Sequence, residues 1–221
     1  ARISAKRAKL LDEQDYEQLL KMKPNEIARR LQEGEYKEDI DSLAPRHEGV
    51  ELVELGLMRN VSRMMGDLID ISPDSLDHML RAFLRRYDIL SLKRLLRWKK
   101  GGEKGEIQDL LLPVGNYTFE EFEELAELEF DQIIEQIEFS ESKIDYKSMI
   151  TDREDIRKIE RDLDRAYFRE ADMLADSVGS RWFSKFIRQE IEYEDLKIAL
   201  RLKKYGKSRE EIEDWLLGDK T

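Results

Sequence analysis

The feature that constrains this chain most is the recurrence of apolar residues at helical spacing along nearly its whole length. In residues 76–87, six apolar side chains follow one another at intervals of one or three, and similar patterns return over residues 156–167 and 183–191. Such spacing places the apolar groups on one face of an α-helix. No stretch alternates apolar and polar residues for long enough to suggest a strand, and only 4 prolines and 11 glycines interrupt the pattern. The sequence therefore predicts an all-α fold of ten or more helices.

The composition narrows the class of protein further. Charged residues and apolar residues each make up 40% of the chain, and the formal net charge is −11. The apolar share is enough to form a core, which argues against a disordered chain. With no cysteine, disulfide scaffolds, zinc–thiolate sites and thiol nucleophiles are excluded. The longest apolar runs are a few residues, such as Leu110 to Leu112, so we expect no membrane span and no signal-peptide core.

Several helix ends can be predicted from local signals. A hydroxyl residue followed three positions later by Glu is typical of a capping box. It occurs at Thr118, Thr151 and Ser208. Ser72 is expected to cap a further helix that has Pro73 at its first position. Helices are expected to stop before glycines 34, 101–102 and 206, the last two after paired lysines.

The chain also contains an internal repeat. Residues 92–100 read LKRLLRWKK and residues 196–204 read LKIALRLKK. After a glycine turn, EIQDLLL at 106–112 corresponds to EIEDWLL at 211–217, and upstream residues 83–85 correspond to 186–188. The blocks share polar identities as well as apolar spacing, which indicates two copies of a helical unit of about 100 residues.

The repeat suggests how the chain is divided. We expect the N-terminal helices and a first helical bundle in residues 1–137, and a second bundle in residues 138–221. The chain starts in mid-pattern and its second copy ends without an evident cap, so we predict a fragment that stops before a third copy. Stacked units need a covered terminal face. We therefore expect Trp215, Leu216 and Leu217 to form an exposed apolar edge.

No constellation of residues points to catalysis. The two histidines, His47 and His78, are on different predicted helices without a third partner nearby in sequence. Gly206-Lys207-Ser208 resembles the end of a phosphate-binding loop, but Arg201 occupies the position of the first glycine and no strand precedes it. We expect no catalytic residue, no cofactor and no metal ligand, and no specific binding of nucleotide.

A basic cluster in each copy is the candidate for function. Lys93 and Arg97 in the first copy, and Lys197 and Arg201 in the second, are spaced by four residues and so share a helix face. We predict that they either bridge to carboxylates within the bundle or contact a partner. The first cluster surrounds Trp98, a composition also found at nucleic-acid contacts, although the net negative charge argues against that partner.

Motifs distributed along the chain carry a resemblance to a known family: the opening Ala1-Arg2-Ile3, Leu10-Leu11, Tyr16 and Leu19-Leu20, the run Tyr87-Asp88-Ile89 to Lys99, and LLPVGNYT at 111–118. In these motifs the chain resembles the C subunit of archaeal-type (A-type) ATP synthases, which belongs to the same family as the eukaryotic V-ATPase d subunit. The resemblance extends over essentially the whole chain. The pattern Asp-x-x-Asn-Leu-Lys of the family has Asp88 and Ser91 in the first copy, and Glu192 and Asp195 in the second, so we expect helix capping by different side chains.

The resemblance implies a funnel-like array of three related helical bundles, of which two are present here. It implies a non-catalytic rotor subunit, peripheral to the membrane on its cytoplasmic face, that couples ATP synthesis to ion transport. Its implied partners are a central-stalk coiled-coil subunit and the membrane ring of proteolipid subunits, and no nucleic acid. Two alternatives stay open: a helical-repeat adaptor unrelated to ATPases, and a nucleic-acid-binding helical protein.

Overall fold

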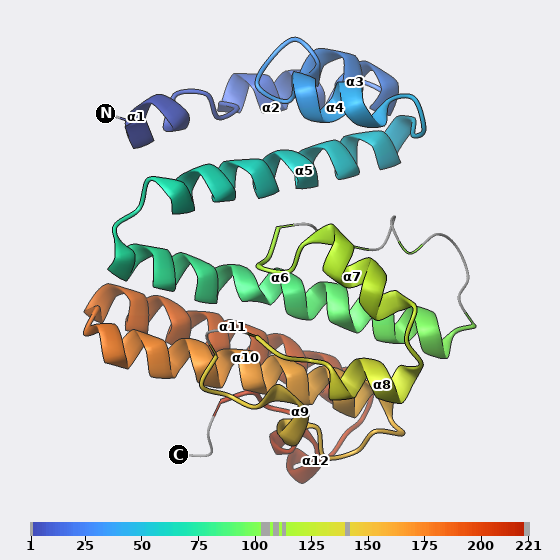
Figure 1. Cartoon of the computed structure of the whole chain (residues 1–221), viewed down its shortest axis with the longest axis vertical. Helices are drawn as coiled ribbons and strands as arrows, with labels where there is room; N and C mark the ends of the chain where they lie inside the picture. Colours follow the sequence, from blue (N-terminus) through green and yellow to red (C-terminus); the bar gives the residue numbers. More distant parts are fainter. Residues whose placement is uncertain (1, 103–106, 108–110, 112–113, 140–141, 219–221) are drawn as a thin grey trace. The chain divides into compact units, whose positions relative to one another are not determined.

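The prediction of an all-α protein is confirmed. The computed structural model describes residues 2–102, 107, 111, 114–139 and 142–218, and within these ranges every regular element is helical (Figure 1). The helices are α1 Arg2–Arg7, α2 Glu13–Leu19, α3 Pro24–Leu31, α4 Lys37–Leu43, α5 Gly49–Asp70, α6 Asp74–Lys100, α7 Phe119–Ala126, α8 Phe130–Glu135, α9 Tyr146–Met149, α10 Ile156–Val178, α11 Arg181–Lys204 and α12 Arg209–Glu213.

The chain separates into two compact units, residues 1–66 and 67–221, and the division falls near the end of α5. The predicted boundary between residues 137 and 138 lies inside the second unit. The main apolar core of that unit takes residues from both sides of it, including Ile137 and Phe139. The division into two repeat copies stays a prediction.

The first unit is built around a small core between α3, α4 and α5. Leu31, Ile40 and Leu52 are buried there with Ala28 and Leu43. The polar edge of this core is closed by Asp39, which is buried and accepts hydrogen bonds from Asn60 Nδ2 at 2.9 Å and Arg63 Nη2 at 3.0 Å. A cation and an amide thus compensate a buried carboxylate, as burial requires.

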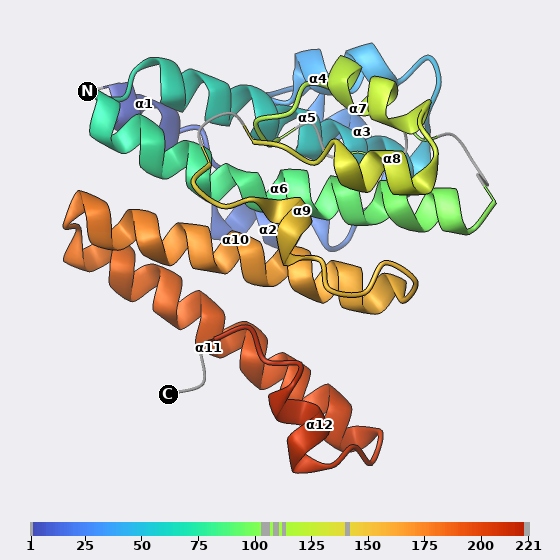
Figure 2. The same ribbon diagram turned by 60° about the horizontal axis from the view of Figure 1, so that its bottom comes forward.

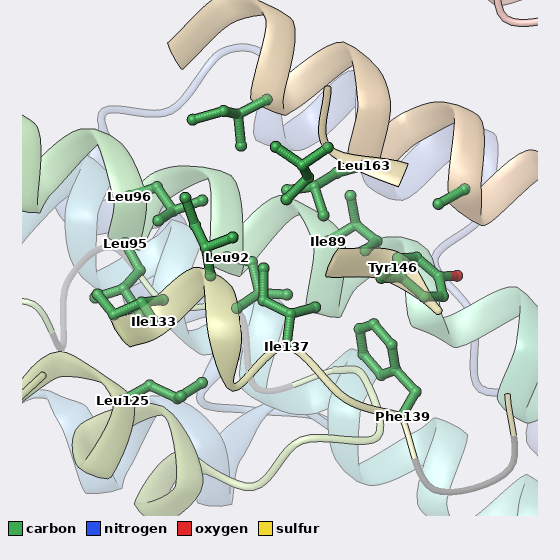
Figure 3. Packing of buried hydrophobic residues seen from close by; sticks show 14 of the residues in the cluster. Ile89, Leu92, Leu95, Leu96, Leu125, Ile133, Ile137, Phe139, Tyr146 and Leu163 are labelled. Carbon is green, nitrogen blue, oxygen red and sulfur yellow. The ribbon is translucent and has the colours of Figure 1, made fainter. Parts of the chain in front are cut away.

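The second unit is organised by three long helices. α10 lies between α6 and α11, and Figure 2 shows α6, α10 and α11 as successive rods. α8 packs on α6. The core fills the space between these elements, and in Figure 3 Leu92 and Leu96 of α6, Ile133 of α8 and Leu163 of α10 converge on it. All four side chains are fully buried.

Local signals predicted some helix ends and missed others. The capping boxes at Thr118 and Ser208 are confirmed, with both reciprocal hydrogen bonds present. Gly206 adopts φ 73° after α11, and the hydrogen bonds from Gly206 N to Lys203 O and from Lys207 N to Leu202 O form a Schellman motif.

Two predicted caps are wrong. Thr151 donates both its N–H and its hydroxyl to Asp162, because that buried carboxylate needs donors, and α10 starts later with Asp155 as its cap. Pro73, not Ser72, is the N-cap of α6, while the Ser72 hydroxyl donates to Leu68 O at the end of α5.

The exposed edge predicted at Trp215, Leu216 and Leu217 is also wrong, because all three residues are partly buried. The guanidinium of Arg161 lies 5.2 Å from the centre of the Trp215 ring. Arg165 donates to Leu216 O, and Leu217 packs against the main core. The cations of α10 therefore hold the segment after α12 in place.

Two glycines of α5 give a matched test of the first core. A Cβ at Gly56 would lie 2.2 Å from Cδ1 of the fully buried Ile40, whereas a Cβ at Gly66 would meet nothing within 4 Å. We expect Gly56→Ala to lower the free energy of unfolding by about 1–3 kcal/mol through overpacking. Gly66→Ala should raise it by about 0.5–1 kcal/mol through helix propensity. Urea denaturation followed by circular dichroism measures both, and equal effects of the two substitutions would contradict the packing described.

Candidate functional site

The candidate site is the interface between α6 and α10. The two helices are antiparallel, since residues 85, 93 and 97 of α6 pair with residues 170, 164 and 160 of α10. A seam of buried apolar side chains runs between them, formed by Leu92 and Leu96 on one helix and Ile159 and Leu163 on the other. The charged pairs accompany this seam, so the interface combines an apolar centre with fixed ionic contacts.

The structure places the two candidate cations of the first copy in this interface. Lys93 Nζ lies 2.8 Å and 2.7 Å from the two carboxylate oxygens of Asp164. Arg97 engages Glu160 with two parallel hydrogen bonds, from Nε and from Nη2, the latter at 2.6 Å. A bidentate guanidinium–carboxylate pair fixes orientation as well as distance. Lys93 and Arg97 thus each contact an acidic residue of α10, and those acidic residues are four positions apart.

A third pair lies deeper and was not predicted from the sequence. Arg85 Nη1 donates to Glu170, and both side chains are about nine-tenths buried. Glu170 also accepts a hydrogen bond from the Tyr146 hydroxyl at 2.7 Å, and the Arg85 guanidinium lies 4.7 Å from the centre of the Phe139 ring. Burial, followed by the charge of Glu170, raises the pKa of Tyr146, so that its hydroxyl stays protonated as a donor.

Asp88 of α6 holds the loop before α7. Its buried carboxylate accepts hydrogen bonds from Asn116 N at 2.9 Å, Tyr117 N at 3.0 Å and Asn116 Nδ2 at 3.1 Å. The loop approaches so closely that a Cβ at Gly115 would lie 1.7 Å from Asp88 Oδ1. The helix-capping role expected of Asp88 is therefore wrong, because its carboxylate anchors a loop from the middle of α6 instead.

Asp195 of α11 does the same for the segment after α12. It accepts hydrogen bonds from Leu217 N at 2.6 Å and Gly218 N at 3.2 Å. By the sequence correspondence, the counterpart of Asp88 is Glu192, one helical turn earlier. α6 and α11 thus each use a mid-helix aspartate to anchor the chain that returns after the glycine turn.

The candidate cations of the second copy have a different environment. Lys197 and Arg201 are exposed on α11. Lys197 pairs with Glu194 of its own helix, at 2.8 Å, and Arg201 has no ion pair with the described residues. The structure therefore does not bring the four candidates together: Lys93 and Arg97 lie in a helix interface, and their counterparts face outwards.

The basic cluster around Trp98 is largely engaged within the chain. Besides the pairs of Lys93 and Arg97, Lys100 Nζ donates to Glu154 O and Lys99 Nζ lies 5.3 Å from the centre of the Trp98 ring. A surface that binds phosphates needs cations free for them. The arrangement therefore disfavours a nucleic-acid contact at this cluster.

Two other kinds of site are absent from the part of the chain that the structure describes. Within the described ranges, no group of three or more His, Asp or Glu side chains is arranged to hold a metal ion. Over the same ranges, none of the helices combines the length and the apolar character needed to cross a bilayer.

Comparison with known proteins identifies the relatives of this chain. The model of a family described as ATP synthase (C/AC39) subunit matches residues 1–218. The C subunit of the A-type ATP synthase of Methanococcoides burtonii is 35% identical over 224 residues, which cover 98% of this chain and 62% of the relative. The corresponding protein of Methanosarcina mazei is 32% identical over 93% of this chain and 58% of its own length. That of Archaeoglobus fulgidus is 29% identical over 96% of this chain and 62% of its own. The chain thus spans about three fifths of the relatives it matches.

Asp88 gives this site a testable pH dependence. Burial raises its pKa from 3.8 to about 6, although the hydrogen bonds from Asn116 and Tyr117 oppose the shift. The folded chain therefore holds this proton to higher pH than the unfolded chain, so the contribution of Asp88 to stability is largest below pH 4 and is lost as pH rises through 6. The loss is about 3 kcal/mol.

Asp88→Asn keeps an acceptor oxygen but cannot titrate. We expect the difference in unfolding free energy between pH 4 and pH 7 to shift by about 2 kcal/mol between wild type and variant, measured by urea denaturation with tryptophan fluorescence. All three tryptophans are in the second unit, so the signal reports the correct region. An unchanged pH profile in the variant would show that the pKa of Asp88 is the same in the folded and the unfolded chain, and would contradict the effect of burial.

Proposed function

The chain belongs to the ATP synthase (C/AC39) subunit family, and from this premise we propose that it is a non-catalytic subunit of a rotary A/V-type ATPase. In this role it couples the central stalk to the membrane rotor ring, so that ATP synthesis is linked to ion transport. The observation that carries the proposal is the family match over residues 1–218, supported by relatives named as C subunits of A-type ATP synthases.

The internal construction suits an element that transmits torque. Such an element must resist shear between its helices. α6 and α10 share a continuous apolar seam, and their antiparallel register is fixed by three ion pairs. Sliding one helix along the other by a turn would separate Arg85 from Glu170 and leave the buried charge of Glu170 without its cation, which is strongly unfavourable.

The proposed partners are a coiled-coil subunit of the central stalk and the ring of proteolipid subunits, with the chain peripheral to the membrane on its cytoplasmic face. We assign Lys93 and Arg97 to bridging within the bundle, which their pairs with Asp164 and Glu160 support. We assign Lys197 and Arg201 to partner contact, which their exposure supports.

Co-purification tests the coupling role. The affinity-tagged chain is produced with the stalk coiled-coil subunit and the proteolipid ring of its own organism, and complexes are isolated in mild detergent. We expect the tag to capture both partners, and the ring to reach the stalk subunit only when the chain is present. Capture of neither partner would contradict the proposal and favour a helical-repeat adaptor of another assembly.

Charge reversal separates the two assigned roles. Lys197→Glu with Arg201→Glu should weaken capture of the partner without changing the melting temperature. Arg97→Glu should lower the melting temperature, because it leaves the nearly buried Glu160 beside a like charge. The reverse pattern, in which only the α11 variant melts early, would overturn the assignment.

A further inference from the structure

α5 crosses the division between the two compact units. The helix is continuous from Gly49 to Asp70, while the first unit ends at Gly66 and the second begins at Asp67. The chain therefore passes from one unit to the next inside a helix and not through a loop. Any change in direction at this division must be absorbed by residues of α5 itself.

The part of α5 that precedes the division is fixed to the first unit. Leu52 is buried in the first core. Further along the helix, Asn60 and Arg63 both donate hydrogen bonds to the buried carboxylate of Asp39 and to Glu35 O. Apolar packing and these four hydrogen bonds thus hold α5 against α4 and the residues before it as far as Arg63.

Gly66 follows this fixed stretch, and neither packing nor backbone conformation requires a glycine there. The residue is exposed, it is not among the glycines with positive φ, and a Cβ added to it would meet nothing within 4 Å. Gly56 in the same helix differs, because a Cβ there would lie 2.2 Å from Ile40 Cδ1. What glycine contributes at position 66 is backbone freedom, at the expense of helix stability relative to alanine.

We propose that α5 bends at Gly66, so that this residue is a hinge between the part of the helix held by the first unit and the part that belongs to the second. Hinges are a few residues, often small ones, that absorb changes in φ and ψ. A hinge at this position lets α5 change direction while the apolar core of each unit stays intact. The inference concerns the chain by itself and does not rest on the proposed function.

The test measures how widely the direction of α5 varies in the whole chain. Because the chain has no cysteine, Glu54→Cys and Lys185→Cys place one nitroxide spin label at an exposed position of each unit. Double electron–electron resonance then gives the distribution of distances between the labels, which a hinge makes broad. Gly66→Ala should narrow it, because the helix preference of alanine over glycine lowers the population of bent molecules about fivefold.

Two controls separate a hinge from general mobility. Labels at Glu124→Cys and Lys185→Cys, both exposed positions of the second unit, should give a narrow distribution that Gly66→Ala leaves unchanged. Arg59→Gly, added to the Gly66→Ala chain, puts a glycine inside the stretch held to α4 and should leave the distribution between the units narrow. Equal widths for the two label pairs in the wild type, no narrowing by Gly66→Ala, or renewed broadening by Arg59→Gly would each overturn the proposal.

Discussion

The second unit depends on the pairing of α6 with α10. A chain in which 40% of residues are charged cannot keep all its charges away from a three-helix core, and here they are placed as cation–carboxylate pairs along an apolar seam. Burial of Leu92, Leu96 and Leu163 supplies the stabilisation. The pairs themselves contribute little net free energy after desolvation, but breaking one that is buried costs about 3–5 kcal/mol. Their main effect is therefore to exclude other registers of the two helices.

The loops follow from this helix pair. Once α6 is fixed, Asp88 presents a buried carboxylate that three N–H donors of Asn116 and Tyr117 must satisfy. That requirement positions the segment before α7, and only glycine at position 115 lets the backbone come close enough. Asp195 imposes a similar requirement on the segment after α12. Side chains in the middle of α6 and α11 thus hold these two irregular segments in place.

The features that could be predicted from the sequence are those that depend on residues close together along the chain. The helical spacing, the caps at Thr118 and Ser208 and the stop at Gly206 depend on residues within a few positions of one another. For Lys93 and Arg97 the sequence narrowed the possibilities to bridging or partner contact without choosing, because the choice depends on which helix packs against them.

Apart from the cap expected at Ser72, whose hydroxyl donates to Leu68 O four residues earlier, the errors share one cause, which is competition from residues distant in sequence. Thr151 would cap a helix locally, but Asp162 takes both of its donors. Arg85 and Glu170 are 85 residues apart, so no local pattern links them. The only available signal was a charged residue within an apolar helical pattern, which indicates a buried partner without identifying it. We expected an exposed apolar edge at Trp215 because the cations that cover this residue belong to α10, which is distant in sequence. The apolar side chains that are exposed lie on α11 instead.

The central claim is that one helix surface occurs twice, covered in α6 and uncovered in α11. The chain has no cysteine, so thiol labelling can test this claim directly with the single variants L96C and L200C. We expect L200C to react with a small thiol reagent at close to the rate of the denatured chain. L96C should react at least about a hundredfold more slowly than L200C, because its side chain becomes accessible only on unfolding. Equal labelling rates in the two folded variants, whether fast or slow, would contradict the account.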